Sequence, residues 1–349
     1  MTLEIFWFCV LALLWTAYFV TEGFDFGVGM LLPVLGRSET DRRTMFESIG
    51  PVWDGNEVWL VIAGGATFAA FPVWYATMFS GFYLALLLIL VLLIVRVLSF
   101  EWREKAESPR WKAFWAFMNT AGSVGAPLLW GIALASLLHG VPIASDQSYA
   151  GDFGDLFSGY SILAGVAVCL LFALHGAVYL TLRTLGDLRE RAQRTASRLA
   201  PVTAVVGAAF LVWTLVVAND KNDKGVFPGI LPVAVAAVAA VAAVLLVRAG
   251  SEKWAFVATA AAIVAVVVTL FVSLYPRVMV SDPDFGNSLT IDNASSAHYS
   301  LTVMTVVAAV LVPLVLLYQA WTYHVFRARL GGEDVGSPVD LVARKTGGS

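Results

Sequence analysis

Charged residues are scarce in this sequence. Of its 349 residues, 13% are charged and 59% are hydrophobic, and the mean hydropathy is +0.79. Soluble domains carry about a quarter charged residues, so a soluble globular fold is excluded. The net charge is only −3, and the basic residues form short scattered clusters. This pattern argues against a nucleic-acid partner.

Cysteine and histidine are also rare. Cys9 and Cys169 lie in separate apolar runs without a C-x-x-C pair, so we expect two buried structural thiols. His175 lies in the middle of an apolar run, where it either hydrogen-bonds a neighbouring helix or serves as a haem ligand; we favour the first. The other three are predicted at membrane interfaces: His139, His298 and His324. No H-x-x-x-H, E-x-x-H or cysteine pattern predicts a metal held by this chain alone.

Long apolar runs dominate the sequence instead. A helix needs about 20 apolar residues to cross a bilayer, and this criterion predicts an all-α, polytopic membrane protein with nine spans. The first run lacks the basic segment and cleavage site of a signal peptide, so we expect it to remain as a span. The spans are predicted at 4–34, 51–70, 75–99, 112–138, 157–183, 199–218, 228–248, 254–275 and 299–326.

The remaining segments are short and polar. Residues 38–49 have apolar residues at helical spacing, which predicts an interfacial amphipathic helix lying on the membrane. No loop is long enough for a second domain, so residues 1–330 are expected to form one membrane domain and 331–349 a polar tail. The spans at 228–248 and 254–275 are Ala/Val-rich, and we expect both to be peripheral and lipid-facing.

Positive charge predicts the orientation of the spans. With the N-terminus outside, all but three of the 22 Lys and Arg residues fall on the inner side of a nine-span arrangement. The three exceptions are Lys221, Lys224 and Arg277. Because Lys and Arg gather in cytoplasmic loops, we predict an outer N-terminus and a cytoplasmic C-terminus.

Two carboxylates lie at the start of the second span. Asp54 and Glu57 are three residues apart and should share a helix face. One interpretation is that Asp54 only complements the positive helix N-terminus, but Glu57 lies roughly 9 Å further along the axis than Pro51. Since charges inside spans usually mark an ion or proton route, we interpret Asp54 as the entry group of a proton path.

A second acid pair, Glu22 and Asp25, lies in the cytoplasmic half of the first span. Its neighbours Gly23, Gly27 and Gly29 predict a close approach of another helix.

Arg96 stands near the inner end of the third span. It either extends its charge to the interface or forms an ion pair with Asp25, Asp54 or Glu57.

Three motifs carry a family resemblance. The runs Glu22-Gly23-Phe24-Asp25-Phe26-Gly27-Val28-Gly29-Met30-Leu31, Trp53-Asp54-Gly55-Asn56-Glu57-Val58-Trp59-Leu60 and Phe79-Ser80-Gly81-Phe82-Tyr83 resemble subunit II of the cytochrome bd-type quinol oxidases. The likeness extends in order from the first span to the ninth.

The resemblance implies a subunit of a prokaryotic plasma-membrane enzyme that oxidises a quinol and reduces O2 to water. Two haems b and one haem d would be ligated by subunit I, a related nine-span chain that pairs with this one about a pseudo-twofold axis. The resemblance does not decide whether small accessory subunits also join the complex.

The same resemblance implies that this haem-poor subunit supports assembly and a proton route from the cytoplasm, so that turnover generates a membrane potential without a pump. The family acid of the W-D-G-N motif corresponds to Asp54. Asn56, Glu57, Glu22 and Asp25 are candidates for the same route. Because the family often has Gln at the position of Glu57, the proton role falls mainly on Asp54.

Two other classes remain as alternatives. A proton-coupled secondary transporter would also bury acids, but its broken helices usually come in pairs near mid-membrane. A purely structural membrane subunit would need no proton route.

Overall fold

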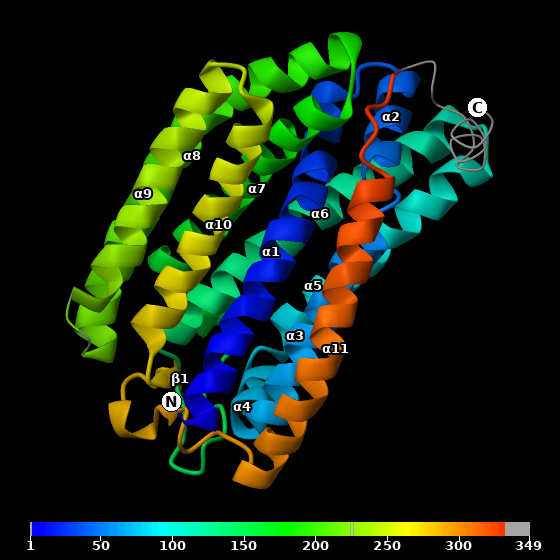
Figure 1. Ribbon diagram of the computed structural model, residues 1–349. Helices are drawn as coiled ribbons and strands as arrows, with labels where there is room; N and C mark the ends of the chain where they lie inside the picture. The colour runs from blue at the N-terminus through cyan, green and yellow to red at the C-terminus, as the bar shows by residue number, and fades with distance from the viewer. Residues whose placement is uncertain (1, 224, 226, 332–349) are drawn as a thin grey trace.

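Long helices make up most of the described chain, which comprises residues 2–223, 225 and 227–331 of the computed structural model (Figure 1). The helices are α1 (Leu3–Leu35), α2 (Glu39–Ile49), α3 (Trp53–Ala70), α4 (Pro72–Gly81), α5 (Tyr83–Trp102), α6 (Pro109–His139), α7 (Gly159–Arg183), α8 (Gly186–Asn222), α9 (Phe227–Arg248), α10 (Glu252–Leu274) and α11 (His298–Val325), with short 3-10 turns at Arg103–Lys105, Phe153–Leu156 and Phe285–Asn287. Two short strands, β1 (Arg277–Met279) and β2 (Leu289–Thr290), pair antiparallel.

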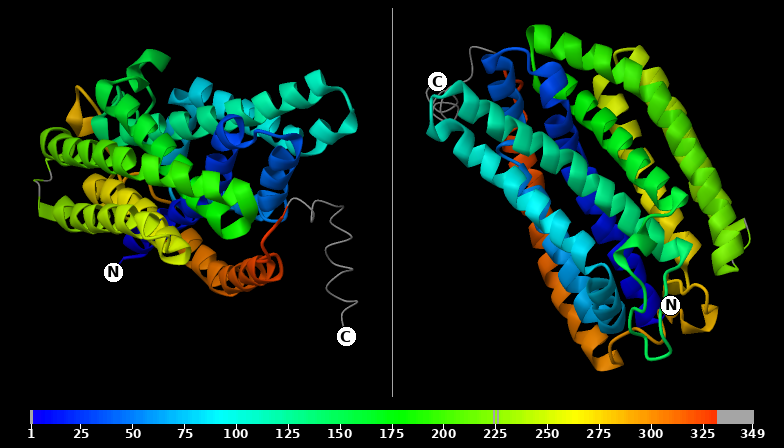
Figure 2. Two further views of the ribbon diagram at one scale, coloured as in Figure 1. Left: turned by 90° about the horizontal axis from the view of Figure 1, so that it is seen from above. Right: turned by 180° about the vertical axis from the view of Figure 1, so that it is seen from behind.

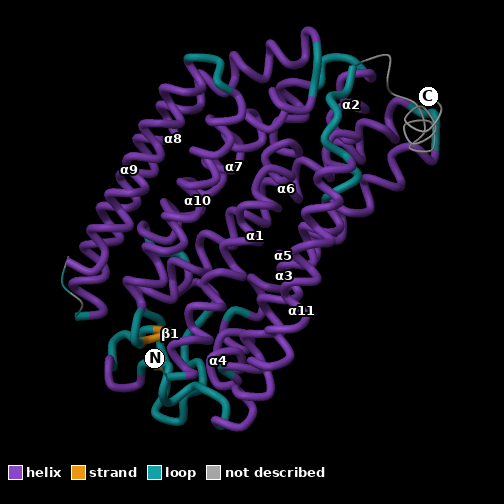
Figure 3. The backbone as a smooth tube through the Cα atoms, in the orientation of Figure 1, coloured by secondary structure: helices purple, strands orange, loops and turns teal. Residues whose placement is uncertain are grey.

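The helices run between two ends of the bundle, and the loops gather at these ends (Figure 3). We call them the α2 end and the β1 end, after the elements that they carry (Figure 1). Eight helices are long and apolar enough to cross a membrane, and nine spans result if α3 and α4 count as one. Of the predicted tail 331–349, all but Gly331 lies outside the described residues.

The predicted break after the second span is confirmed, but the start of the third span is wrong. Phe71 leaves the helical region (φ −133°, ψ 69°) because the residue before a proline cannot easily stay helical. As a result the chain bends by 119° between α3 and α4. The predicted span 75–99 therefore divides between α4 and α5, which begins at Tyr83.

The helix that contains the sixth predicted span, 199–218, is longer than the span itself. Helix α8 begins at Gly186 rather than at residue 199, and its 37 residues extend about 55 Å at 1.5 Å per residue. This exceeds the roughly 30 Å of a hydrocarbon core, so its first turns project from the α2 end. Leu188, Ala192 and Ala196 recur every fourth residue and are buried, which holds this extension in helical form.

The helix predicted at 38–49 is present as α2. Ser38 begins it with a capping box that Asp41 completes. Its apolar face, however, lies on protein rather than on the membrane: Met45 and Ile49 are fully buried in the bundle. The hydroxyl of Tyr179 on α7 also donates to the Ser48 carbonyl at 2.7 Å.

Helix α1 forms the centre of the bundle. It packs against α3, α6, α7 and α10, and α9 and α11 stand at the edges (Figures 1 and 2). The expectation that both Ala/Val-rich spans are peripheral holds for α9 and is wrong for α10. Ala258, Thr259 and Ala262 of α10 are buried because small side chains let it approach α7 and α1.

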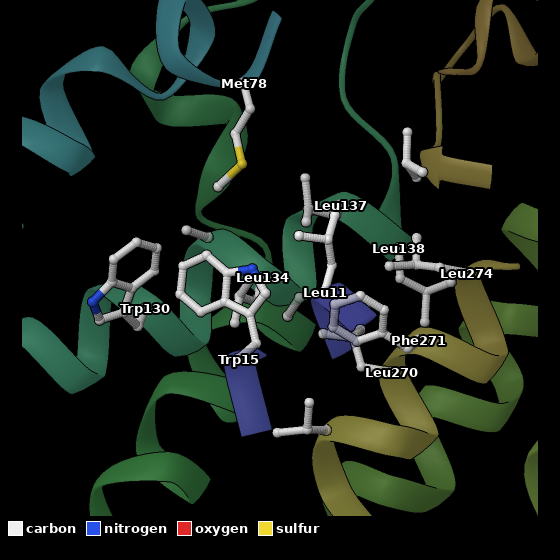
Figure 4. Close-up of a cluster of buried hydrophobic side chains, with 14 of the residues drawn as sticks. Leu11, Trp15, Met78, Trp130, Leu134, Leu137, Leu138, Leu270, Phe271 and Leu274 are labelled. Atoms are coloured by element: carbon white, nitrogen blue, oxygen red, sulfur yellow. The ribbon is translucent and has the colours of Figure 1, made fainter. Parts of the chain in front are cut away.

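Aromatic and aliphatic side chains fill the core near the β1 end (Figure 4). Trp15 and Trp130 meet edge to face with ring centroids 5.0 Å apart, beside an apolar cavity of about 350 Å³. The expected burial of both cysteines is wrong, since Cys9 is exposed on α1 and Cys169 is partly exposed on α7.

Candidate functional site

Helix α3 begins at Trp53 and places Asp54 in its first turn at the α2 end. The Asp54 side chain is exposed, in line with Val58 and Val61 on the outer face of α3. Glu57 is only partly exposed. The two acids therefore do not share one environment: Asp54 faces outward, whereas Glu57 lies at the edge of the bundle interior.

Asn56 is fully buried and joins three helices. Its Nδ2 donates to Asp25 Oδ2 on α1 at 2.7 Å and to the Thr21 carbonyl at 3.3 Å. Its Oδ1 accepts from the Tyr323 hydroxyl at 2.6 Å and from Gln319 Nε2 at 3.3 Å, both on α11. A side-chain amide offers two donor hydrogens and one acceptor oxygen, so the hydrogen-bonding capacity of the Asn56 side chain is fully occupied.

Gln319 and Tyr323 of α11 were not among the site residues predicted from the sequence. Gln319 also accepts from Trp59 Nε1 at 2.7 Å through its Oε1, so it bridges two side chains of α3. The available signal was that Gln319 is the single side-chain amide within the last apolar run. A lone amide in a span usually has a partner on a neighbouring helix.

Arg96 pairs with Glu22, which was not among the partners expected for it. The Arg96 Nη1 to Glu22 Oε1 distance is 2.5 Å, and both side chains are fully buried, so extension of the charge to the interface is also wrong. The guanidinium lies 4.6 Å from the centre of the Phe26 ring. Arg96 also interacts electrostatically with Glu57 and Asp25, and one cation thus offsets three acids.

Several polar atoms around this ion pair have no hydrogen-bond partner within the described protein. They include Asp25 Oδ1, Glu22 Oε2, Arg96 Nε and the Tyr18 hydroxyl. Buried polar groups are normally bonded to protein or to ordered water. The interior beside Asp25 and Glu22 therefore offers sites at which water can be held.

The glycines of α1 explain how a polar centre fits inside the bundle. A Cβ on Gly27 would lie 2.0 Å from the Phe172 carbonyl oxygen and 2.8 Å from Gly176 of α7. A Cβ on Gly23 would meet the Phe172 ring, and one on Gly29 would meet Ser123 of α6. Backbone contact of this closeness is possible only with glycine, and it sets the position of Glu22 and Asp25.

His175 hydrogen-bonds its neighbouring helices, as favoured from the sequence. Its Nδ1 lies 2.7 Å from Thr259 Oγ1 of α10, and its Nε2 lies 3.2 Å from the Val20 carbonyl of α1. The ring stacks on Phe256 with centroids 4.5 Å apart. Since both nitrogens are engaged and one face is covered, His175 does not fit the role of a haem ligand. Within residues 2–223, 225 and 227–331, no group of three His, Cys, Asp or Glu side chains is placed to hold a metal.

Known proteins resemble this chain in sequence and in fold. The sequence pattern of cytochrome bd terminal oxidase subunit II matches residues 3–326. The chain belongs to this family. Within it, cytochrome bd ubiquinol oxidase subunit 2 of Bacillus subtilis is 40% identical over 94% of this chain and 97% of that protein. Cytochrome bd-I ubiquinol oxidase subunit 2 of Escherichia coli is 37% identical over 95% of this chain and 96% of that protein.

The fold of this subunit II is also found in a solved structure. The bd oxidase from Geobacillus thermodenitrificans contains a chain that superposes with a TM-score of 0.73 at 20% identity, covering 93% of this chain and 98% of that one. Together with the many apolar helices, family membership makes the chain a multi-pass plasma-membrane subunit of an oxidoreductase complex that contains haem and a partner subunit.

Proposed function

We propose that this subunit of a quinol oxidase supplies the route by which protons reach the site of O2 reduction from the cytoplasm. The observation that carries the proposal is a series of polar groups that leads from the surface inward. It begins at exposed Asp54, passes part-buried Glu57 and buried Asn56, and reaches Asp25 and Glu22 in the interior.

Each step of this series has a physical basis. Asp54 stands in the first turn of α3, where solvent can reach it. Asn56 fixes Asp25 by a 2.7 Å hydrogen bond but leaves Asp25 Oδ1 without a protein partner. Asp25 and Glu22 lie one helical turn apart on α1, and Arg96 offsets their charge. Carboxylates with free oxygens and water sites between them can pass protons along the series.

We further propose that the N-terminus is outside and the C-terminus is cytoplasmic. Since Asp54 and most Lys and Arg residues lie at the α2 end, that end would be the cytoplasmic one.

The haems, two of b type and one of d type, would belong to subunit I, which pairs with this chain about a pseudo-twofold axis. Supporting this division, His175 is unavailable as a ligand. Within the described part of α11 only Leu301 is buried, which leaves a long face for a partner.

The test of the proton role is Asp54→Asn in the assembled oxidase. We expect subunit content and reduced-minus-oxidised haem spectra to stay unchanged, while quinol oxidation slows at least tenfold. Glu101→Gln serves as the matched control, because Glu101 is another exposed carboxylate at the α2 end. Glu57→Gln should have a mild effect. Normal turnover in a fully assembled Asp54→Asn oxidase would remove Asp54 from the route.

A further inference from the structure

A groove runs along the bundle edge, away from the acid series. Helices α7, α8, α9 and α10 enclose an apolar cavity of about 170 Å³. Its walls carry small side chains, among them Ala204, Gly207 and Ala208 of α8 and Ala237 and Ala240 of α9. Ala208 and Ala237 are exposed, so the cavity opens sideways toward the membrane.

The length of this groove suits one lipid tail. Along α8 its lining extends from residue 200 to residue 212, which is about 18 Å at 1.5 Å per residue. One leaflet of a bilayer contributes about half of the roughly 30 Å hydrocarbon core. The groove thus extends through approximately one leaflet, starting at the α2 end.

Basic side chains lie on α8 and α9 beyond the α2 end of the groove. Arg194 on α8 lines a second, open cavity together with Gly250 and Glu252. Arg198 lies one helical turn from Arg194 toward the groove, and Arg248 ends α9. All three arginines are exposed.

The acids nearby leave this cluster positive. Glu252 is already engaged by Arg189 and by Arg329. Glu190 lies only 3.9 Å from Arg194 and offsets a single charge. Exposed Lys253 and Trp254 follow at the start of α10, and tryptophan is enriched at the level of lipid headgroups.

We propose that this site binds an anionic phospholipid, with one acyl chain in the groove and the phosphate between Arg194, Arg198 and Arg248. Charge complementarity selects the headgroup, because basic pockets between spans on the cytoplasmic side bind anionic lipids. The apolar walls select the tail, since they offer little to a free phosphate ion. The opening at Ala208 and Ala237 lets the lipid enter from the bilayer.

The first test uses the whole oxidase, purified in detergent and washed to remove loose lipid. Bound phospholipids are then identified by mass spectrometry after extraction. We expect about one phosphatidylglycerol or cardiolipin per complex, and a loss of at least fivefold in the triple variant Arg194→Gln, Arg198→Gln, Arg248→Gln. The control triple removes the same charge elsewhere at the α2 end, through Arg37→Gln, Lys105→Gln and Arg110→Gln, and should retain the lipid.

The second test blocks the groove without changing charge. Ala208→Phe places a ring in the opening, whereas Ala209→Phe, one residue on, points away from the groove. Only the first should lose the lipid. The proposal is overturned if the washed oxidase holds no anionic lipid, if it holds zwitterionic lipid or quinone there instead, or if both arginine triples retain the anionic lipid equally.

Discussion

The buried pair of Arg96 and Glu22 allows a quantitative prediction about stability. Both side chains are fully removed from solvent and lie 2.5 Å apart. Arg96→Met would leave Glu22, with Asp25 beside it on α1, without the cation that offsets them. Breaking a buried pair in this way costs about 3–5 kcal/mol, which corresponds to a shift in the folded-to-unfolded ratio of roughly 10² to several thousand.

The same reasoning predicts a rescue. Replacing both partners, with Glu22→Gln and Arg96→Met, removes the unpaired charge, so the double variant should regain most of the lost free energy of unfolding. The assay is a double-mutant cycle on the purified oxidase, unfolded by stepwise addition of SDS to detergent micelles. The pair of Arg43 and Glu47, 3.1 Å apart, provides the control cycle, because Arg43 is exposed and Glu47 is only partly buried, and surface pairs of this spacing contribute about 0.3–0.5 kcal/mol.

The outcome that refutes this reasoning is a coupling energy for Arg96 and Glu22 no larger than that of the control pair. Such a result would mean that water, rather than Arg96, satisfies Glu22. A double variant that is as unstable as Arg96→Met alone would contradict it equally.

Three further predictions concern other parts of the fold. Gly27→Ala should lower assembly of the oxidase several-fold, because its Cβ would press on α7, whereas Gly207→Ala, with no atom within 4 Å of its Cβ, should leave complex yield unchanged or raise it. Glu252→Gln should speed tryptic cleavage after Arg329 several-fold, since their ion pair holds the Arg329 side chain against α10. Tyr149 in the loop between α6 and α7 has a pKa of about 12, raised by burial and then by nearby acids. An unfolded tyrosine ionises near pH 10, so folded stability should fall between pH 10 and 12, and Tyr149→Phe should abolish that part of the fall.

The sequence predicts the positions of most spans well because each span depends on a local property. About 20 apolar residues suffice to define a span, and Pro72 alone marks the break after α3. The start of α8 could not be found in this way, because its first turns are polar outside and are kept helical by the buried stripe from Leu188 to Ala196.

Pairings within the site were harder to predict. The sequence placed Glu22, Asp25 and Arg96 in the inner halves of their spans, but it could not decide which acid faces Arg96. This depends on helix rotation and on contacts such as Gly27 against Gly176. The contributions of Gln319 and Tyr323 depend on α11 lying beside α3, and a contact between residues more than 250 positions apart leaves no local pattern.

The position of α11 has a consequence for biogenesis. Asn56 is synthesised early, yet two of its hydrogen-bond partners, Gln319 and Tyr323, belong to the last helix. During insertion into the bilayer, Asn56 Oδ1 therefore lacks these two donors until almost the entire chain has been synthesised. A nascent subunit that stops before α11 has an unsatisfied amide oxygen in its second span, which distinguishes it chemically from the finished protein.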